Sequence, residues 1–145
     1  MEMMAVIAII GVILAIALPA YSSWRERTAV RSAADALMAH LKQARHLAIA
    51  ENRSVTIDFT PPPPPKRPVY WFDKGRGQPY RNKRIVLPRG VTLATRLTGG
   101  KLTFTSRGTA ANACVTLASA THARWVEVNG IGRAYFAPKK PKGCP

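Results

Sequence analysis

Few side chains in this chain have the types and spacing that catalysis or metal binding requires. On a helix, six residues put His40 and His46 roughly 240° apart, so these imidazoles do not share a face for a metal ion, and His122 is distant. The seven carboxylates include no pair at a spacing typical of acid–base catalysis. Residues 130–135 (GIGRAY) lack parts of a dinucleotide fingerprint, and residues 98–102 (TGGKL) lack parts of a P-loop. We therefore expect no enzyme activity, no metal site and no cofactor.

Basic residues are the strongest feature of the composition. The 22 Lys and Arg against 7 Asp and Glu give a formal net charge of +15. From Lys66 onward there are 16 basic residues, and the two acids Asp73 and Glu127 leave +14 in that half. Residues 73–84 (DKGRGQPYRNKR) form the densest basic segment, which we expect to be a glycine-containing loop. Such charge suits a polyanion, either nucleic acid or an anionic membrane face; the alternative is a solvated basic surface without a particular partner.

The two cysteines, Cys114 and Cys144, lack the close spacing of a zinc or thioredoxin site. In an oxidising compartment they would form one disulfide that ties the tail to a strand. In the cytosol they would remain two free thiols. The sequence of this region leaves both outcomes open.

An apolar run follows the carboxylate of Glu2. Residues 3–20 contain no charged or polar side chain. The length of this run is about the minimum for crossing a membrane. A secretory signal peptide would begin with basic residues, and none precedes the run. Arg25, Arg27 and Arg31 follow it, so the positive-inside rule would place the rest of the chain in the cytoplasm. A carboxylate at a membrane edge is costly unless it has a partner, so Glu2 requires an explanation.

The apolar run continues into an amphipathic helix. Pro19 should kink or weaken the helix, and Gly11 is a second soft point. We expect the helix to end near residue 51 or 52. Helical periodicity places one apolar stripe on Val30, Ala34, Leu37, Leu41, Ala44 and Ala48.

The rest of the chain shows the two-residue periodicity of short strands. They are expected at residues 54–59, 69–72, 85–87, 91–95, 102–105, 114–117, 125–128 and 134–136. Between the first two lies a proline run, residues 61–68, which we interpret as a stiff polyproline II connector; a docking ligand for an SH3-like partner is the alternative.

These elements predict an α+β fold, in which a long N-terminal helix packs on an antiparallel β-sheet or small β-sandwich. Residues 1–22 would form the membrane-spanning half of the helix. Residues 23–145 would form one globular domain, with the amphipathic helix half at 23–52 and the β-rich part at 53–145.

The first 60 or so residues resemble type IV pilins and type II secretion pseudopilins, and more narrowly the FimT/GspH group of minor pilins. Glu2, Gly11, Pro19 and Tyr21 match the family's glutamate, helix glycine, helix-breaking proline and following tyrosine. Further matches are RSAADAL at residues 31–37, QARHLAI at residues 43–49, and the pair Gly132 and Arg133. The resemblance implies a pilin-like fold and association with other pilin subunits in a helical fibre. Glu2 would pair there with the N-terminal ammonium of a neighbouring subunit; a carboxylate in the headgroup region is the alternative.

The resemblance also implies a biogenesis route. A prepilin carries a short basic leader that prepilin peptidase removes, and no such leader precedes Met1 here. We hypothesise that the start of this sequence is misplaced or that the chain is truncated, which translation of the DNA upstream of Met1 would test. With a leader restored, the protein would be a single-pass inner-membrane protein with a periplasmic domain, later moving to the pilus and cell surface. A disulfide between Cys114 and Cys144 would be allowed there.

Two functions compete within this family. A FimT-like protein would capture extracellular DNA for natural transformation through a Gly-Arg-x-Arg motif, although here Tyr135 replaces the second arginine. The alternative within the family is a structural FimU- or GspH-like subunit that initiates or caps a pilus or pseudopilus. Outside the family, a third possibility is a membrane-anchored basic protein unrelated to pili. The net charge favours sequence-independent DNA binding. The candidate residues are Arg133, Tyr135, Lys139, Lys140 and Lys142, with Lys74, Arg76, Arg81, Lys83 and Arg84 in the basic segment.

Overall fold

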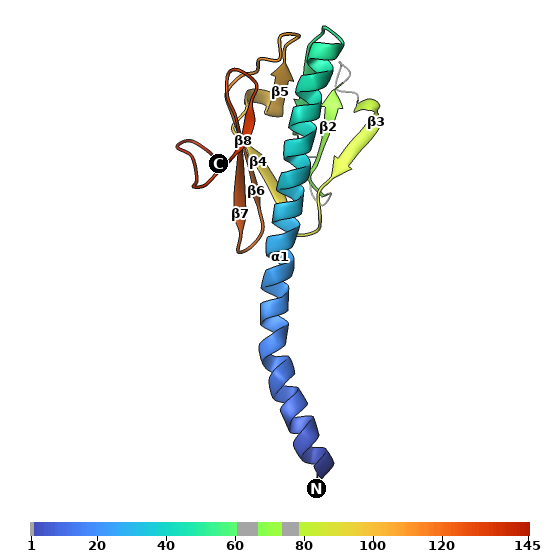
Figure 1. Ribbon diagram of the computed structural model, residues 1–145, viewed down its shortest axis with the longest axis vertical. Coiled ribbons are helices and arrows are strands. Elements are labelled where there is room, and N and C mark those ends of the chain that lie inside the picture. The colour runs from blue at the N-terminus through green and yellow to red at the C-terminus, as the bar shows by residue number, and fades with distance from the viewer. Residues whose placement is uncertain (1, 61–66, 74–78) are drawn as a thin grey trace.

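One helix and two antiparallel sheets make up the computed structural model, which describes residues 2–60, 67–73 and 79–145 (Figure 1). Within these ranges, the side chains at positions 2, 5, 8, 14, 16–19 and 79–83 are not described. The elements are, in order, α1 (Glu2–Ala50), β1 (Val55–Asp58), β2 (Val69–Asp73), β3 (Pro79–Val86), β4 (Thr92–Thr95), the short 3-10 helix η1 (Thr98–Gly100), β5 (Lys101–Phe104), β6 (Ala113–Ala118), β7 (Ala123–Val128) and β8 (Ala134–Ala137).

Helix α1 has two different halves. The first half extends away from the sheets, and it runs through Gly11 and Pro19 without a break in its helical assignment (Figure 1). Within the part of the chain that the structure describes, no helix combines the length and hydropathy of a membrane span. The expected membrane span is therefore not confirmed.

The second half of α1 packs against both sheets. The six residues of the predicted apolar stripe are at most 1 % exposed, which confirms the periodicity. Ala33 and Met38 widen the buried face. The helix ends at Ala50, within two residues of the expected position.

The strands form two separate four-stranded sheets, in the orders β3-β2-β1-β5 and β4-β6-β7-β8. All neighbouring strands are antiparallel, and all eight predicted strands are present. In β1 the fully buried Ile57 lies between Phe72 of β2 and Leu102 of β5. Side chains from both sheets and from α1 thus form one core. The α+β fold class is confirmed.

The prediction of a loop at residues 73–84 is wrong over much of this segment. Asp73 is the last residue of β2. Residues 79–84 belong to β3, because β3 pairs with β2 as far as the pair formed by Pro79 and Asp73. A register shift between Trp71 and Asp73 accommodates this pairing. Strand β3 lies at the edge of its sheet, where basic side chains discourage pairing with another chain. The proline run and Lys74 and Arg76 lie outside the described residues.

Two of the few carboxylates have a structural role beside β1. Asp58 is 3 % exposed, and its Oδ1 accepts a hydrogen bond from the backbone N–H of Thr60 at 2.8 Å. Lys101 Nζ lies 3.5 Å from an oxygen of Asp58 and 3.5 Å from an oxygen of Asp73. The lysine therefore balances two acids that come together across three strands.

Truncation of the helix stripe should destabilise the whole domain. Leu37→Ala removes a fully buried side chain and leaves a cavity between α1 and the sheets, so the free energy of unfolding should fall by about 2–5 kcal/mol. Chemical denaturation followed by circular dichroism measures this change. The exposed Lys42 gives the control, because Lys42→Ala should change stability by less than about 0.5 kcal/mol. Equal effects of the two substitutions would contradict the packing.

Candidate nucleic-acid interface

The turn between β7 and β8 presents Arg133 to solvent. The backbone N–H of Gly132 donates to the carbonyl of Asn129 at 2.8 Å, and the N–H of Asn129 donates to the carbonyl of Arg133 at 3.1 Å. The Asn129 side-chain oxygen accepts a third hydrogen bond, from the Arg133 backbone N–H at 2.8 Å. These bonds fix the backbone of Arg133, whereas its guanidinium is exposed.

Gly132 allows this turn to pack against the segment between β5 and β6. Its φ is +74°, and an added Cβ would lie 1.9 Å from the carbonyl oxygen of Gly108. Arg45 of α1 donates from Nε to the same carbonyl at 3.1 Å. The glycine of the Gly-Arg pair is therefore required by packing, and the arginine beside it is left available for a ligand.

The same contact brings Arg107 to the interface, which sequence reasoning missed. Arg107 directly precedes Gly108 and is exposed. The two segments are also joined by a hydrogen bond from the Ala110 N–H to the Gly130 carbonyl at 3.3 Å. No local pattern in the sequence indicates that Arg107 and Arg133 come from neighbouring turns.

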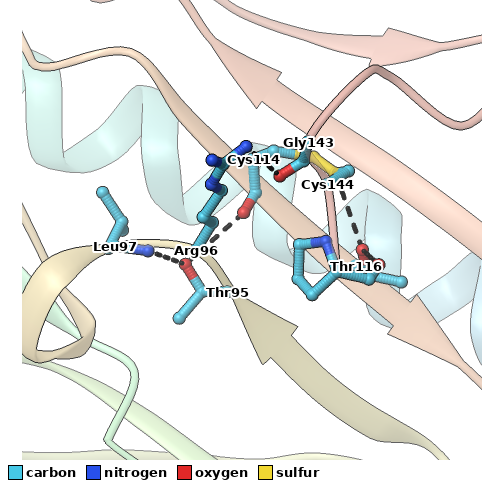
Figure 2. The surroundings of a disulfide bond; sticks show 8 residues. Thr95, Arg96, Leu97, Cys114, Thr116, Gly143 and Cys144 are labelled. Atoms are coloured by element: carbon cyan, nitrogen blue, oxygen red, sulfur yellow. Dashed lines mark hydrogen bonds between the residues drawn. A yellow bond between two sulfur atoms is a disulfide. The ribbon is translucent and has the colours of Figure 1, made fainter.

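A disulfide fixes the C-terminal tail to the second sheet. Cys114 of β6 is bonded to Cys144, with 5.7 Å between their Cα atoms, so of the two outcomes that the sequence leaves open the structure has the disulfide. Thr116 Oγ1 donates to the Pro145 carbonyl at 2.9 Å, and Arg96 donates from a terminal nitrogen to the Gly143 carbonyl at 3.0 Å (Figure 2). The tail loops away from the sheet and returns to it (Figure 1). Lys139, Lys140 and Lys142 are exposed on this loop.

Tyr135 lies between the turn and the tail. It pairs across β7 and β8 with Glu127, which in turn pairs with Cys114 of β6. The hydrogen bond between the phenol and the Glu127 carboxylate raises the pKa of Tyr135, with smaller contributions from burial and from the charge of Glu127. The phenol is thus already bonded, while the side chain is 42 % exposed and its ring can accept a stacked base.

An open cleft joins these features. It has a volume of about 540 Å³, and its lining includes Arg96, Asn112, Glu127, Tyr135, Lys142 and Gly143. Arg96 and Lys142 line the cleft. Together with the exposed Lys139 and Lys140 of the tail and the exposed Arg107 and Arg133 of the two neighbouring turns, they make up what we call the tail patch. Among the described residues, none of these six side chains forms an ion pair. The arrangement offers phosphate-binding groups around an aromatic ring.

The structure separates the two groups of predicted DNA-binding residues. Strand β3 and the tail lie on opposite sides of α1 (Figure 1). Arg84 is exposed on β3, and its guanidinium lies 5.5 Å from the centre of the Trp71 ring in the first sheet. Arg81 and Lys83 are on the same strand, with side chains that are not described, and Lys74 and Arg76 lie outside the described residues. Glu2 begins α1, and its side chain is also not described, so its assembly role stays a prediction.

A side chain at position 132 should disrupt the turn that carries Arg133. Gly132→Ala combines a left-handed backbone with a clash against the Gly108 carbonyl, so the free energy of unfolding should fall by at least about 2 kcal/mol. Gly130→Ala is the matched control, because its Cβ would meet only the Asn112 side-chain oxygen at 3.6 Å. Denaturant titration of both variants measures the difference. A Gly132→Ala protein as stable as Gly130→Ala would refute the packing role.

Loss of the disulfide should release the tail. For a loop closed across 30 residues, the chain-entropy model predicts that Cys114→Ala with Cys144→Ala lowers the free energy of unfolding by about 3–4 kcal/mol. Trypsin should then cleave after Lys139 and Lys142 faster than in the oxidised wild type, and a reductant should have the same effect on the wild type. Unchanged cleavage would mean that the disulfide does not hold the tail.

Comparisons with known proteins identify the fold and the family. Residues 33–132 match the family model described as type II transport protein GspH. The crystal structure of the type IV minor pilin FimU from Pseudomonas aeruginosa is similar, with 22% identity and a TM-score of 0.66 over 84% of this chain and 99% of that chain. The minor pseudopilin EpsH of the type 2 secretion system of Vibrio cholerae gives 16% identity and a TM-score of 0.61 over 77% and 98% of the two chains. No curated protein sequence matches.

The family match covers more than half of the chain and ends at Gly132, directly before Arg133 and the tail. The two similar structures show that the chain has their fold, and membership of the family favours association with other pilin subunits in a fibre. The chain therefore belongs to the GspH family, and it shares its fold with the minor pilin FimU and the minor pseudopilin EpsH.

Proposed function

We propose that this minor pilin binds DNA without sequence preference through the tail patch, and that it serves DNA uptake in natural transformation. The observation that carries the proposal is the disulfide-anchored tail, which exposes Lys139, Lys140 and Lys142 and lines one cleft together with Arg96 and Tyr135. Contacts between such cations and phosphates release counterions and are indifferent to the base sequence.

The tail compensates for the altered arginine motif. In the FimT group, which this chain resembles, a Gly-Arg-x-Arg motif contacts DNA, and Tyr135 occupies the position of the second arginine here. The phenol of Tyr135 is bonded to Glu127, so its contribution would be stacking by the ring rather than a contact to phosphate. The lysines of the tail and Arg107 supply the positive charge that a second arginine would otherwise provide.

The cellular setting of this proposal follows the family. The subunit would reside in the inner membrane with its globular domain in the periplasm, and would then enter the pilus, where Glu2 would pair with the N-terminus of a neighbour. Prepilin peptidase would process the precursor of such a subunit.

The second candidate is a purely structural subunit that initiates or caps a pilus or pseudopilus. The likeness to the minor pilin FimU and the minor pseudopilin EpsH favours it. The net charge of +15 favours DNA binding, because contacts between pilin subunits do not require so large an excess of positive charge.

Substitution of the tail patch should weaken DNA binding and its salt dependence together. We expect Arg133→Ala with Lys139→Ala and Lys140→Ala to reduce the affinity of the full chain for all DNA sequences alike. The slope of log affinity against log salt should fall by about one unit for each lost phosphate contact. Fluorescence anisotropy with duplexes of unrelated sequence, measured across a salt series, provides both quantities.

The edge strand of the first sheet supplies the matched control. Arg81→Ala with Lys83→Ala and Arg84→Ala removes the same number of charges on β3 and should leave the slope unchanged. A loss confined to this β3 variant would move the site to the first sheet. Absence of DNA binding by the wild type would leave the structural role as the function.

A further inference from the structure

A second basic surface lies where α1 leaves the globular domain. An open cleft of about 590 Å³ is lined there by Arg25, Arg67 and Arg89, and Glu26 also contributes to its lining. The three arginines come from α1, from the residues before β2 and from the connection between β3 and β4. All three are exposed. We call them the collar.

The carboxylate within the collar is already bonded to another part of the domain. Glu26 accepts hydrogen bonds from Thr121 Oγ1 at 2.7 Å and from Ser119 Oγ at 3.3 Å, both in the turn between β6 and β7. Among the described residues, no carboxylate lies within ion-pair distance of the three collar guanidinium groups. Three cations and one anion leave a net positive cleft, open to a ligand with negative charge.

Two aromatic side chains precede the collar on α1. Tyr21 and Trp24 are 57 % and 61 % exposed, their ring centres are 6.0 Å apart, and the Arg25 guanidinium lies 5.9 Å from the Tyr21 ring. On the N-terminal side of this pair, α1 exposes large apolar residues such as Met3, Ile7 and Ile13. Trp and Tyr at the end of an apolar helix, followed by basic residues, are typical of the boundary between a membrane and water.

We propose that the collar and the aromatic pair form a docking surface for anionic phospholipid head groups, which seats the base of the globular domain on a membrane. Guanidinium groups bind phosphate oxygens through paired hydrogen bonds, and the two rings would lie at head-group depth. A lipid surface is favoured over DNA here because the collar adjoins the exposed apolar half of α1. The tail patch uses a different set of residues, so each surface can be tested without removing the other.

The test compares vesicles of phosphatidylcholine with vesicles that contain phosphatidylcholine and phosphatidylglycerol in equal parts. The full chain is diluted from detergent into each, and binding is measured by co-flotation. The ratio of the two affinities removes the shared contribution of the apolar helix. We expect a clear preference for the anionic vesicles, and Arg25→Gln with Arg67→Gln and Arg89→Gln should reduce that preference by about 100-fold, close to fivefold for each charge.

Two matched variants make the result specific. Lys139→Gln with Lys140→Gln and Lys142→Gln removes the same charge from the tail patch and should keep the lipid preference. Arg25→Lys with Arg67→Lys and Arg89→Lys should retain most of it, since the charge remains. An equal loss of lipid preference in the collar and tail variants would mean that only net charge matters, and it would overturn the proposal. A collar glutamine variant with an unchanged lipid preference would also overturn it. The collar glutamine variant should still bind DNA, so failure of this proposal is distinguishable from failure of the DNA-binding function.

Discussion

The burial of one face of α1 against two separate sheets is the constraint on which the rest of the structure depends. The two sheets share no strand, and side chains of the helix complete the core between them. Four alanines, Ala33, Ala34, Ala44 and Ala48, are among the buried residues, and such small side chains allow strands to approach the helix closely. The helix then determines where the functional surfaces lie. Arg45, near its C-terminal end, contacts the Gly108 carbonyl beside the Arg133 turn, and Glu26, where it leaves the domain, binds the turn between β6 and β7.

The distribution of charge follows from this architecture. The positive charge is not uniform, because the tail patch and the collar lie on different parts of the domain and β3 carries a third basic group at a sheet edge. Lys101 balances Asp58 and Asp73, and hydroxyl groups bind Glu26. These three carboxylates are therefore engaged within the fold. Glu127 is the acid that lines the tail-patch cleft, where it bonds to Tyr135.

Local periodicity explains which parts of the fold could be predicted from the sequence. The stripe from Val30 to Ala48 repeats at helical spacing, so its buried face was predictable without knowledge of its partners. The start of β3 was not, because residues 79–84 are proline-containing and basic and are held as a strand by pairing with β2. The proximity of Arg107 to Arg133 and the separation of the tail from β3 depend on contacts between distant segments. The Gly-Arg pair was recognised from family resemblance, whereas the packing reason for its glycine needed the structure.

The central claim is that DNA contacts the second sheet around the anchored tail. Ultraviolet crosslinking of the full chain to single-stranded DNA, followed by mass spectrometry of the crosslinked peptides, tests it directly, because the exposed ring of Tyr135 lies within the cleft. The account predicts crosslinks in the peptide that contains Tyr135, and their loss in a Tyr135→Leu variant. Crosslinks confined to β3 or to the segment around Trp24 would contradict it.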